Sequence, residues 1–209
     1  MTTKKTKPVK KVVKKKIVKK PVKKMTAADK MTAAEKRVAI AKDTIKWLGT
    51  KSIKMKPGTY FQFPHKAIKV RNSDRKLDVA LETVKKPCQV CALGGMFYSM
   101  VRRFDKVPVR VCNTYYEVNT EYAEGVGHDD IYYELAKYFP GHQLSLIESA
   151  FEKRDLIEME DYKGIEKEFD ANVDNVVDRA VAFARKENAV ERLRAIMNNI
   201  IENNGAFKP

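Results

Sequence analysis

One pair of cysteines has a spacing that can bind a metal ion or form a dithiol: Cys88-Gln-Val-Cys91. Two thiolates at this spacing supply half of a tetrahedral zinc site, and Cys112 and His128 downstream would complete a set of four ligands. A zinc ribbon has two such pairs, whereas here the last two candidates are single residues. We therefore expect no metal and no other cofactor, and we interpret Cys91 as a small residue of the core.

Two features of the chain could support catalysis. We expect a helix from Pro87, whose N-terminus, together with the two lysines before it, would lower the pKa of the Cys88 thiol. His128-Asp129-Asp130 has acid–base potential, although helix capping explains the two aspartates equally well. The sequence contains no phosphate loop, dinucleotide fingerprint, nucleophile elbow or kinase signature. We lean toward a protein that is not an enzyme and assign no catalytic residue.

The strongest chemical signal is the position of the charge. The 209 residues contain 42 Lys plus Arg and 27 Asp plus Glu, which gives a net charge of +15. Residues 1–24 contain 12 lysines and no acidic residue. A segment with so many like charges cannot bury enough apolar surface to offset the entropy of ordering, so we predict a disordered tail. Its lysines are Lys4, Lys5, Lys7, Lys10, Lys11, Lys14, Lys15, Lys16, Lys19, Lys20, Lys23 and Lys24.

A dense run of lysine is chemically complementary to a polyphosphate, because each neutralised phosphate releases condensed counterions. The tail has no Arg, Asn or Gln to read base edges and no aromatic residue to stack on single strands. We therefore predict that these 12 lysines bind DNA or another nucleic acid without sequence specificity. Two alternatives stay open, namely a tail that only aids solubility and a tail that adsorbs to anionic lipid.

Several classes of protein do not fit this sequence. No apolar run approaches the roughly 20 residues that a membrane-spanning helix needs. The basic N-terminus lacks the apolar stretch of a signal peptide. Three cysteines suit a reducing compartment in which thiols stay free. We expect a cytoplasmic protein without a membrane span.

Residues 25–209 are expected to fold as a single α+β domain that is mainly helical, with a small β-sheet or hairpin. Two successive copies of a Thr-x-x-acid pattern mark a helix start, so Thr26 or Thr32 can cap with Asp29 or Glu35 reaching back. The helix that follows Thr32 is expected to end at Gly49. A short strand, a turn at Pro57-Gly58 and a second strand should follow. The later elements expected are a helix over 73–84, an apolar helix over 87–104, a strand over 107–111, a helical hairpin broken at 140–141, a loop over 155–170 and helices from 173 and from 190.

Three segments together resemble a known family. They read PCQVCALGGMFYSMVR over 87–102, DDIYYELAKYFPGHQLSLIESAFE over 129–152 and ERLRAIMNNIIENNGAFKP over 191–209. The family consists of small, uncharacterised proteins of tailed bacteriophages and their bacterial relatives, in which a Cys-Ala-Leu-Gly helix precedes a Gln-Leu-x-Leu-Ile-Glu-x-Ala-Phe helix. The resemblance covers the chain from about Val38 onward, without the tail. It implies a phage context and carries over no site residue.

Three hypotheses of function follow. The first is a phage-encoded accessory protein in the host cytoplasm, which the tail holds on nucleic acid while the body contacts a host or phage protein. The second is a host-takeover or anti-defence inhibitor that acts by protein–protein contact. The third is an enzyme that uses Cys88 or the cluster formed by His128, Asp129 and Asp130.

Overall fold

The computed structural model describes residues 30–62, 87–104, 110–112, 115–117, 125–126 and 128–209. The lysines of the tail, His65 and the helix expected over 73–84 lie outside these residues. Between residues 110 and 130, the description covers only the backbone of the helix and strand residues, without their side chains.

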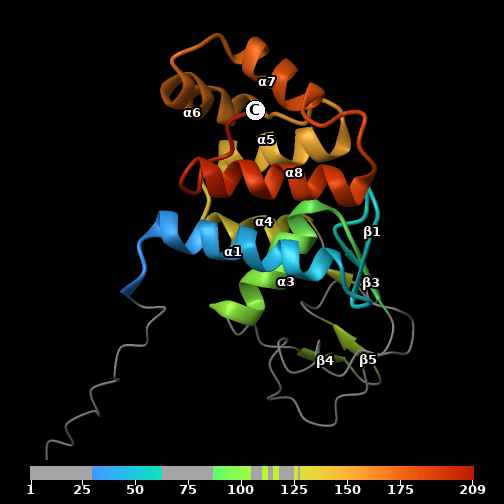
Figure 1. Cartoon of the computed structure of the whole chain (residues 1–209). Coiled ribbons are helices and arrows are strands. Elements are labelled where there is room, and N and C mark those ends of the chain that lie inside the picture. Colours follow the sequence, from blue (N-terminus) through green and yellow to red (C-terminus); the bar gives the residue numbers. More distant parts are fainter. Residues whose placement is uncertain (1–29, 63–86, 105–109, 113–114, 118–124, 127) are drawn as a thin grey trace, which may run out of the picture.

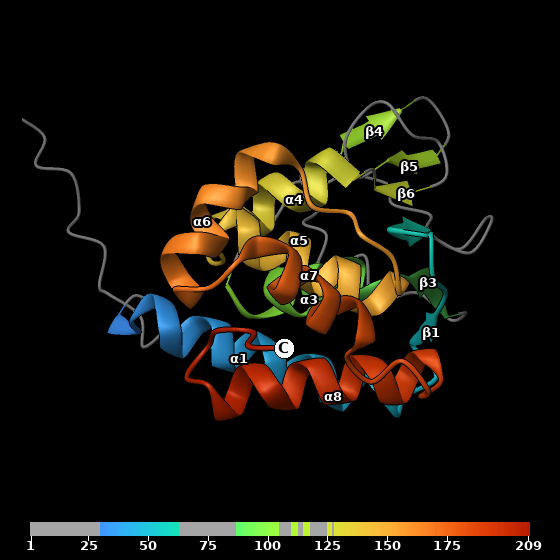
Figure 2. The same ribbon diagram turned by 90° about the horizontal axis from the view of Figure 1, so that it is seen from above.

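The described part is mainly helical with a small sheet, as the sequence predicts. Helices α3 and α5 are central: α3 packs against α1, α4 and α5, and α5 packs against α6, α7 and α8. Helices α1 and α8 run side by side (Figures 1 and 2). The helices are α1 (Ala33–Leu48), α3 (Ala92–Arg103), α4 (His128–Ala136), α5 (Gly141–Glu152), α6 (Met159–Phe169), α7 (Val173–Ala182) and α8 (Ala189–Glu202).

The larger sheet has four short strands in the order β1-β3-β2-β6, namely β1 (Ile53–Met55), β3 (Cys88–Val90), β2 (Phe61–Gln62) and β6 (Gly125–Val126). Strand β3 is parallel to β1 and antiparallel to β2, which in turn is antiparallel to β6. The expected turn at Pro57-Gly58 is present, and Gly58 has a φ of 69°, which favours glycine. A separate pair joins β4 (Arg110–Cys112) to β5 (Tyr115–Glu117).

Helix α3 forms the centre of the core, and its residues from Ala92 to Val101 are buried. The expected helix from Pro87 is wrong in its first turn, because Cys88–Val90 form a strand between β1 and β2. Gly94 lets the chain at Tyr60 cross α3 closely, since a Cβ at Gly94 would lie 1.6 Å from the Tyr60 carbonyl oxygen. This contact fixes the sheet against the core.

Local sequence signals place several helix ends correctly. Thr32 and Glu35 form the expected capping box of α1, and Gly49 is its C-cap. The two closing helices are present as α7 and α8. Asn172 and Asn188 cap them, because each side-chain oxygen accepts hydrogen bonds from backbone N–H groups of the first turn.

Two other sequence predictions are wrong. The expected loop over 155–170 contains α6, which buries Ile165 and packs Tyr162 and Phe169 against the core. Asp129 and Asp130 do not occupy the N-cap of α4, because that helix already begins at His128. None of the helices in the described part is long and apolar enough to cross a membrane.

Candidate functional site

The two cysteines of the Cys-x-x-Cys motif are buried free thiols. Cys88 lies in β3, Cys91 is the N-cap of α3, and each is 1% exposed. Burial raises the pKa of both thiols to about 12. The expectation of a lowered pKa at Cys88 is therefore wrong, because this residue lies within the sheet and not in the first turn of a helix. The interpretation of Cys91 as a core residue is confirmed.

The other candidate metal ligands lie on elements of which the structure describes the backbone alone. No group of three or more His, Cys, Asp and Glu residues suited to a metal ion occurs among the described residues. Backbone geometry places Cys112 in β4 and His128 at the start of α4 with Asp129 and Asp130. The side chains of these four residues lie outside the described part, so the acid–base cluster stays a prediction.

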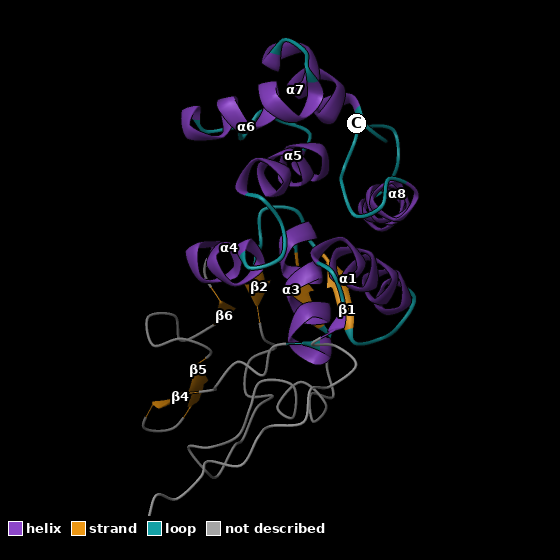
Figure 3. Cartoon of the chain, turned by 90° about the vertical axis from the view of Figure 1, so that its left-hand side faces the viewer, coloured by secondary structure: helices purple, strands orange, loops and turns teal. Residues whose placement is uncertain are grey.

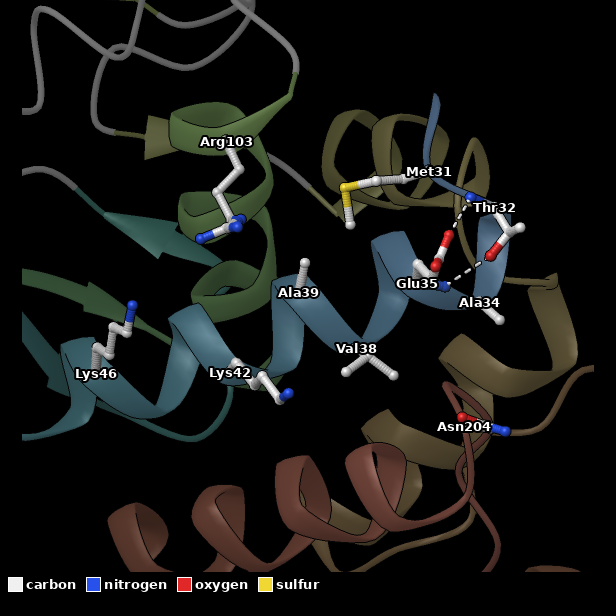
Figure 4. A pocket seen from close by; sticks show the side chains of 10 residues that line it. All are labelled: Met31, Thr32, Ala34, Glu35, Val38, Ala39, Lys42, Lys46, Arg103 and Asn204. Carbon is white, nitrogen blue, oxygen red and sulfur yellow. Dashed lines mark hydrogen bonds between the residues drawn. The ribbon is translucent and has the colours of Figure 1, made fainter. Parts of the chain in front are cut away.

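A groove runs along α1 in the described part of the chain. It has a volume of about 640 Å³ and is bordered by α1 and by the last residue of α3, Arg103 (Figure 4). It is lined by Met31, Thr32, Ala34, Glu35, Val38, Ala39, Lys42, Lys46, Arg103 and Asn204. We call it the α1 groove.

The α1 groove has an apolar end and a cationic end. Met31, Ala34 and Val38 lie toward the N-terminus of α1, together with Glu35, whose carboxylate accepts a hydrogen bond from the backbone N–H of Thr32. Lys42 and Lys46 are exposed, one helical turn apart, near the C-terminus of α1. Neither lysine pairs with a carboxylate of the described residues, so both ammonium groups are available to an anionic ligand.

Helices α1 and α3 are tied together at the cationic end. Nη1 of Arg103 lies 3.3 Å from Oδ1 of Asp43, and Nε1 of Trp47 donates a 2.9 Å hydrogen bond to Oδ2 of the same carboxylate. The guanidinium of Arg102 lies 4.5 Å from the centroid of the Trp47 ring, in a cation–π contact. These contacts order the cationic end before any ligand binds.

The position of the α1 groove relates it to the lysine tail. Met31 and Thr32 line its apolar end, and the chain reaches them directly from the segment that contains the tail. The first residues of the described body thus form the groove, six residues or more after Lys24.

A second concave surface has the opposite charge. A pocket of about 260 Å³ between α4, α5 and the start of α6 is lined by Tyr132, Tyr133, Ser145, Glu148, Leu156, Glu158, Glu160 and Asp161. Burial raises the pKa of Tyr132, and the nearby charges of Asp161, Glu160 and Glu158 raise it further. This pocket therefore concentrates negative charge among α4, α5 and α6, whose ribbons lie to the left of α1 in Figure 3.

His142, in the first turn of α5, links that helix to α6. Its Nε2 contacts Oε2 of Glu168 on α6. Burial would raise the pKa of Glu168, but hydrogen bonds from His142 and Gln143 outweigh this effect and lower the pKa. Gln143 also binds the backbone N–H and carbonyl of Phe207, so this cluster anchors the C-terminus. The polar groups of His142, Gln143 and Glu168 thus hold helices and the C-terminal segment together by hydrogen bonds.

Comparisons with known proteins do not identify the chain. No family model, no curated protein and no solved structure matches it. The site must therefore be judged on its own chemistry.

Sequence reasoning missed the residues of the α1 groove. Lys42 and Lys46 at positions i and i+4 of a predicted helix were the available signal, since they share a face. The contribution of Arg103 required the position of α3 next to α1, which no local pattern reveals.

Proposed function

We propose that this protein is a non-enzymatic accessory protein that binds nucleic acid without sequence specificity through its lysine tail, while its body contacts a second partner in the α1 groove. The single observation that carries the proposal is that 12 lysines and no acidic residue occupy the first 24 positions of a chain whose net charge is +15. Charge of this density attracts a polyphosphate at long range and neutralises it on contact.

The surface of the body supports a separate role for the groove. Its apolar end offers Met31 and Val38, which a sugar–phosphate backbone does not need, whereas a protein segment can bury them. Its cationic end offers Lys42 and Lys46 to carboxylates. The groove thus suits a protein partner with apolar and acidic side chains, and the tail suits nucleic acid.

The chemistry of the thiols favours binding over catalysis. A nucleophilic cysteine needs an accessible thiolate, whereas burial raises the pKa of Cys88 and Cys91 to about 12. The resemblance of three segments to tailed-phage proteins supports a phage setting in the cytoplasm of a host cell.

The direct test compares the full-length protein with a full-length variant in which the 12 tail lysines are replaced by glutamine. Binding to two unrelated labelled 20-base-pair duplexes is measured by fluorescence anisotropy at about 100 mM salt. We expect equal affinity for both duplexes and a loss of about 100-fold or more in the variant. Lys42→Gln/Lys46→Gln serves as the control and should change DNA affinity by less than about threefold.

A variant without tail lysines that binds DNA as tightly as the parent would refute the proposal. Pull-down from nuclease-treated lysate separates the alternatives, because a partner that survives nuclease is held by protein contact. If the protein is an inhibitor that acts through its tail, the parent should still capture its protein partner after nuclease treatment. The variant without tail lysines should not capture it.

A further inference from the structure

Two surfaces of this protein are complementary to one another in charge and in apolar character. The first is the α1 groove, with apolar residues at one end and Lys42, Lys46 and Arg103 at the other. It extends along α1 from Thr32 to Lys46, a distance of about 21 Å at 1.5 Å per helical residue. Val38 and Lys42 are four residues apart, so the apolar and cationic parts of the groove meet within about one helical turn, which a short segment can cover.

The second surface is the acidic turn, which we define as residues 158–161 at the start of α6. Met159 is 85% exposed, and the other exposed large hydrophobic side chain in the described part, Tyr133 at 74%, lines the acidic pocket beside this turn. An unbranched methionine at such exposure can adapt its shape to an apolar partner surface.

The carboxylates on both sides of Met159 are free to meet cations. Glu158 is the N-cap of α6 but makes no side-chain capping hydrogen bond. Glu158 and Glu160 are exposed, and their side chains form no hydrogen bond or ion pair with a described residue. Asp161 differs, because it accepts a hydrogen bond from the Ser145 hydroxyl.

The charge of the body is divided in the same way as these two surfaces. Residues 30–62 contain eight Lys plus Arg and two acidic residues, whereas residues 128–170 contain twelve acidic residues and five Lys plus Arg. Helix α5 lies between α6 and the layer of α1 and α3, in both Figure 1 and Figure 3. The acidic turn of one molecule therefore cannot fill its own groove, but it faces away from the molecule and is open to another.

We propose that the α1 groove binds the acidic turn of a second copy of this chain. Met159 of one copy would cover the apolar end around Val38, while Glu158 and Glu160 would pair with the cations at the other end. The contact joins two different surfaces, so it is head-to-tail and can extend to further copies. The exposed surfaces are small, so the contact is weak in solution and salt-sensitive.

This inference rests on the proposed role of the groove as a partner site, but it does not require binding to nucleic acid. Where the tail also holds the molecules on one polyanion, the raised local concentration would favour the contact and make binding cooperative. Self-association of the protein alone is therefore the decisive property, and it can be tested without nucleic acid.

The test is sedimentation velocity of the full chain, freed of nucleic acid by nuclease and a high-salt wash. We expect the mean sedimentation coefficient to rise with concentration at 50 mM salt and to rise much less at 500 mM salt. Lys42→Glu/Lys46→Glu and Glu158→Lys/Glu160→Lys should each weaken association by about tenfold or more. The matched controls Lys51→Glu/Lys54→Glu and Asp178→Lys/Glu202→Lys change the same charge elsewhere and should retain it.

A mixture of the groove variant (Lys42→Glu/Lys46→Glu) with the turn variant (Glu158→Lys/Glu160→Lys) tests the proposed pairing most directly. Each variant alone presents two like-charged surfaces, but in an equimolar mixture every groove can meet a turn of opposite charge. We expect the mixture to recover association. A protein that is monomeric at all concentrations, or variants that the mixture fails to rescue, would overturn the inference. Loss in the turn variant without loss in the groove variant would overturn it too, because the turn would then bind elsewhere.

Discussion

Arg103 and Asp43 connect the two helices that border the α1 groove, with Nη1 of Arg103 lying 3.3 Å from Oδ1 of Asp43. Asp43 is 9% exposed, and its second oxygen accepts a hydrogen bond from Nε1 of Trp47. A nearly buried carboxylate is costly unless donors satisfy it, and here an indole and a guanidinium do so. The position of Arg103 at the cationic end of the groove thus depends on the carboxylate of Asp43.

Replacing Asp43 should separate the two roles of its carboxylate. Asp43→Ala leaves the indole N–H of Trp47 without its acceptor, so we expect a loss of about 1–3 kcal/mol in the free energy of unfolding. Asp43→Asn keeps an acceptor oxygen and should cost less than Asp43→Ala. Urea unfolding followed by tryptophan fluorescence measures both. If the two variants were as stable as the parent, the contact would contribute nothing to the fold.

The close approach of Tyr60 to Gly94 predicts a strong effect of one added methyl group. A Cβ at Gly94 would lie 1.6 Å from the Tyr60 carbonyl oxygen, which is backbone and cannot rotate away. We expect Gly94→Ala to destabilise the protein by about 3 kcal/mol or more, or to prevent folding. Gly49→Ala is the matched control, because nothing lies within 4 Å of its Cβ position.

Thermal unfolding of both glycine variants decides this prediction. Gly49 has a φ of −93°, which alanine adopts without strain, so its variant should match the parent or exceed it slightly. Equal melting temperatures for Gly94→Ala and the parent would show that the chain at Tyr60 does not approach α3 as described.

The fold could be predicted where the signals were local. Thr32 and Glu35 cap α1 by hydrogen bonds within one turn, and their pattern was one of the two helix starts that the sequence offered, with Thr26 and Asp29 as the other. Cys88 to Val90 could not be assigned from their own residues, because they become a strand by pairing with β1 and β2. Helix α6 was not predicted because acidic residues dominate its sequence. Its apolar residues Tyr162, Ile165 and Phe169 have helical spacing and pack against the core.

The candidate site was predictable to a similar degree. The tail is recognised from composition alone, since its net charge follows from its residues without any fold. The α1 groove depends on where α3 ends, and the acidic turn depends on a helix whose exposed Met159 looks like any other apolar residue in the sequence. Both surfaces therefore required tertiary structure.

The buried thiols predict slow chemistry and a defined dependence on pH. In a Cys112→Ser background, we expect Cys88 and Cys91 to react with a disulfide reagent at pH 8 at least about 100-fold more slowly in the folded protein than in urea. Their pKa is raised to about 12 in the folded state from an ordinary value of 9.0. Rapid labelling of the folded protein would contradict this description of the two thiols.

The free energy of unfolding should fall at high pH, because the two thiols lose their protons at lower pH in the unfolded chain than in the folded protein. Above about pH 9 the unfolded chain ionises these thiols while the folded chain keeps them protonated, so stability falls as pH rises toward 12. Between pH 8 and pH 10 each thiol should contribute a loss of about 1 kcal/mol. Urea midpoints at both pH values measure the loss, which should be smaller in Cys88→Ala. An equal loss in Cys88→Ala and the parent would show that this thiol ionises alike in both states.

The salt dependence of DNA binding tests most directly whether the lysine tail acts as a polycation independent of the body. Affinity for a duplex is measured from about 50 to 300 mM salt for the full-length protein and for the variant with glutamine at all 12 tail lysines. We predict that log K falls against log salt with a slope of roughly −10 in the parent and of about −3 or shallower in the variant. The same slope in both proteins would contradict the account.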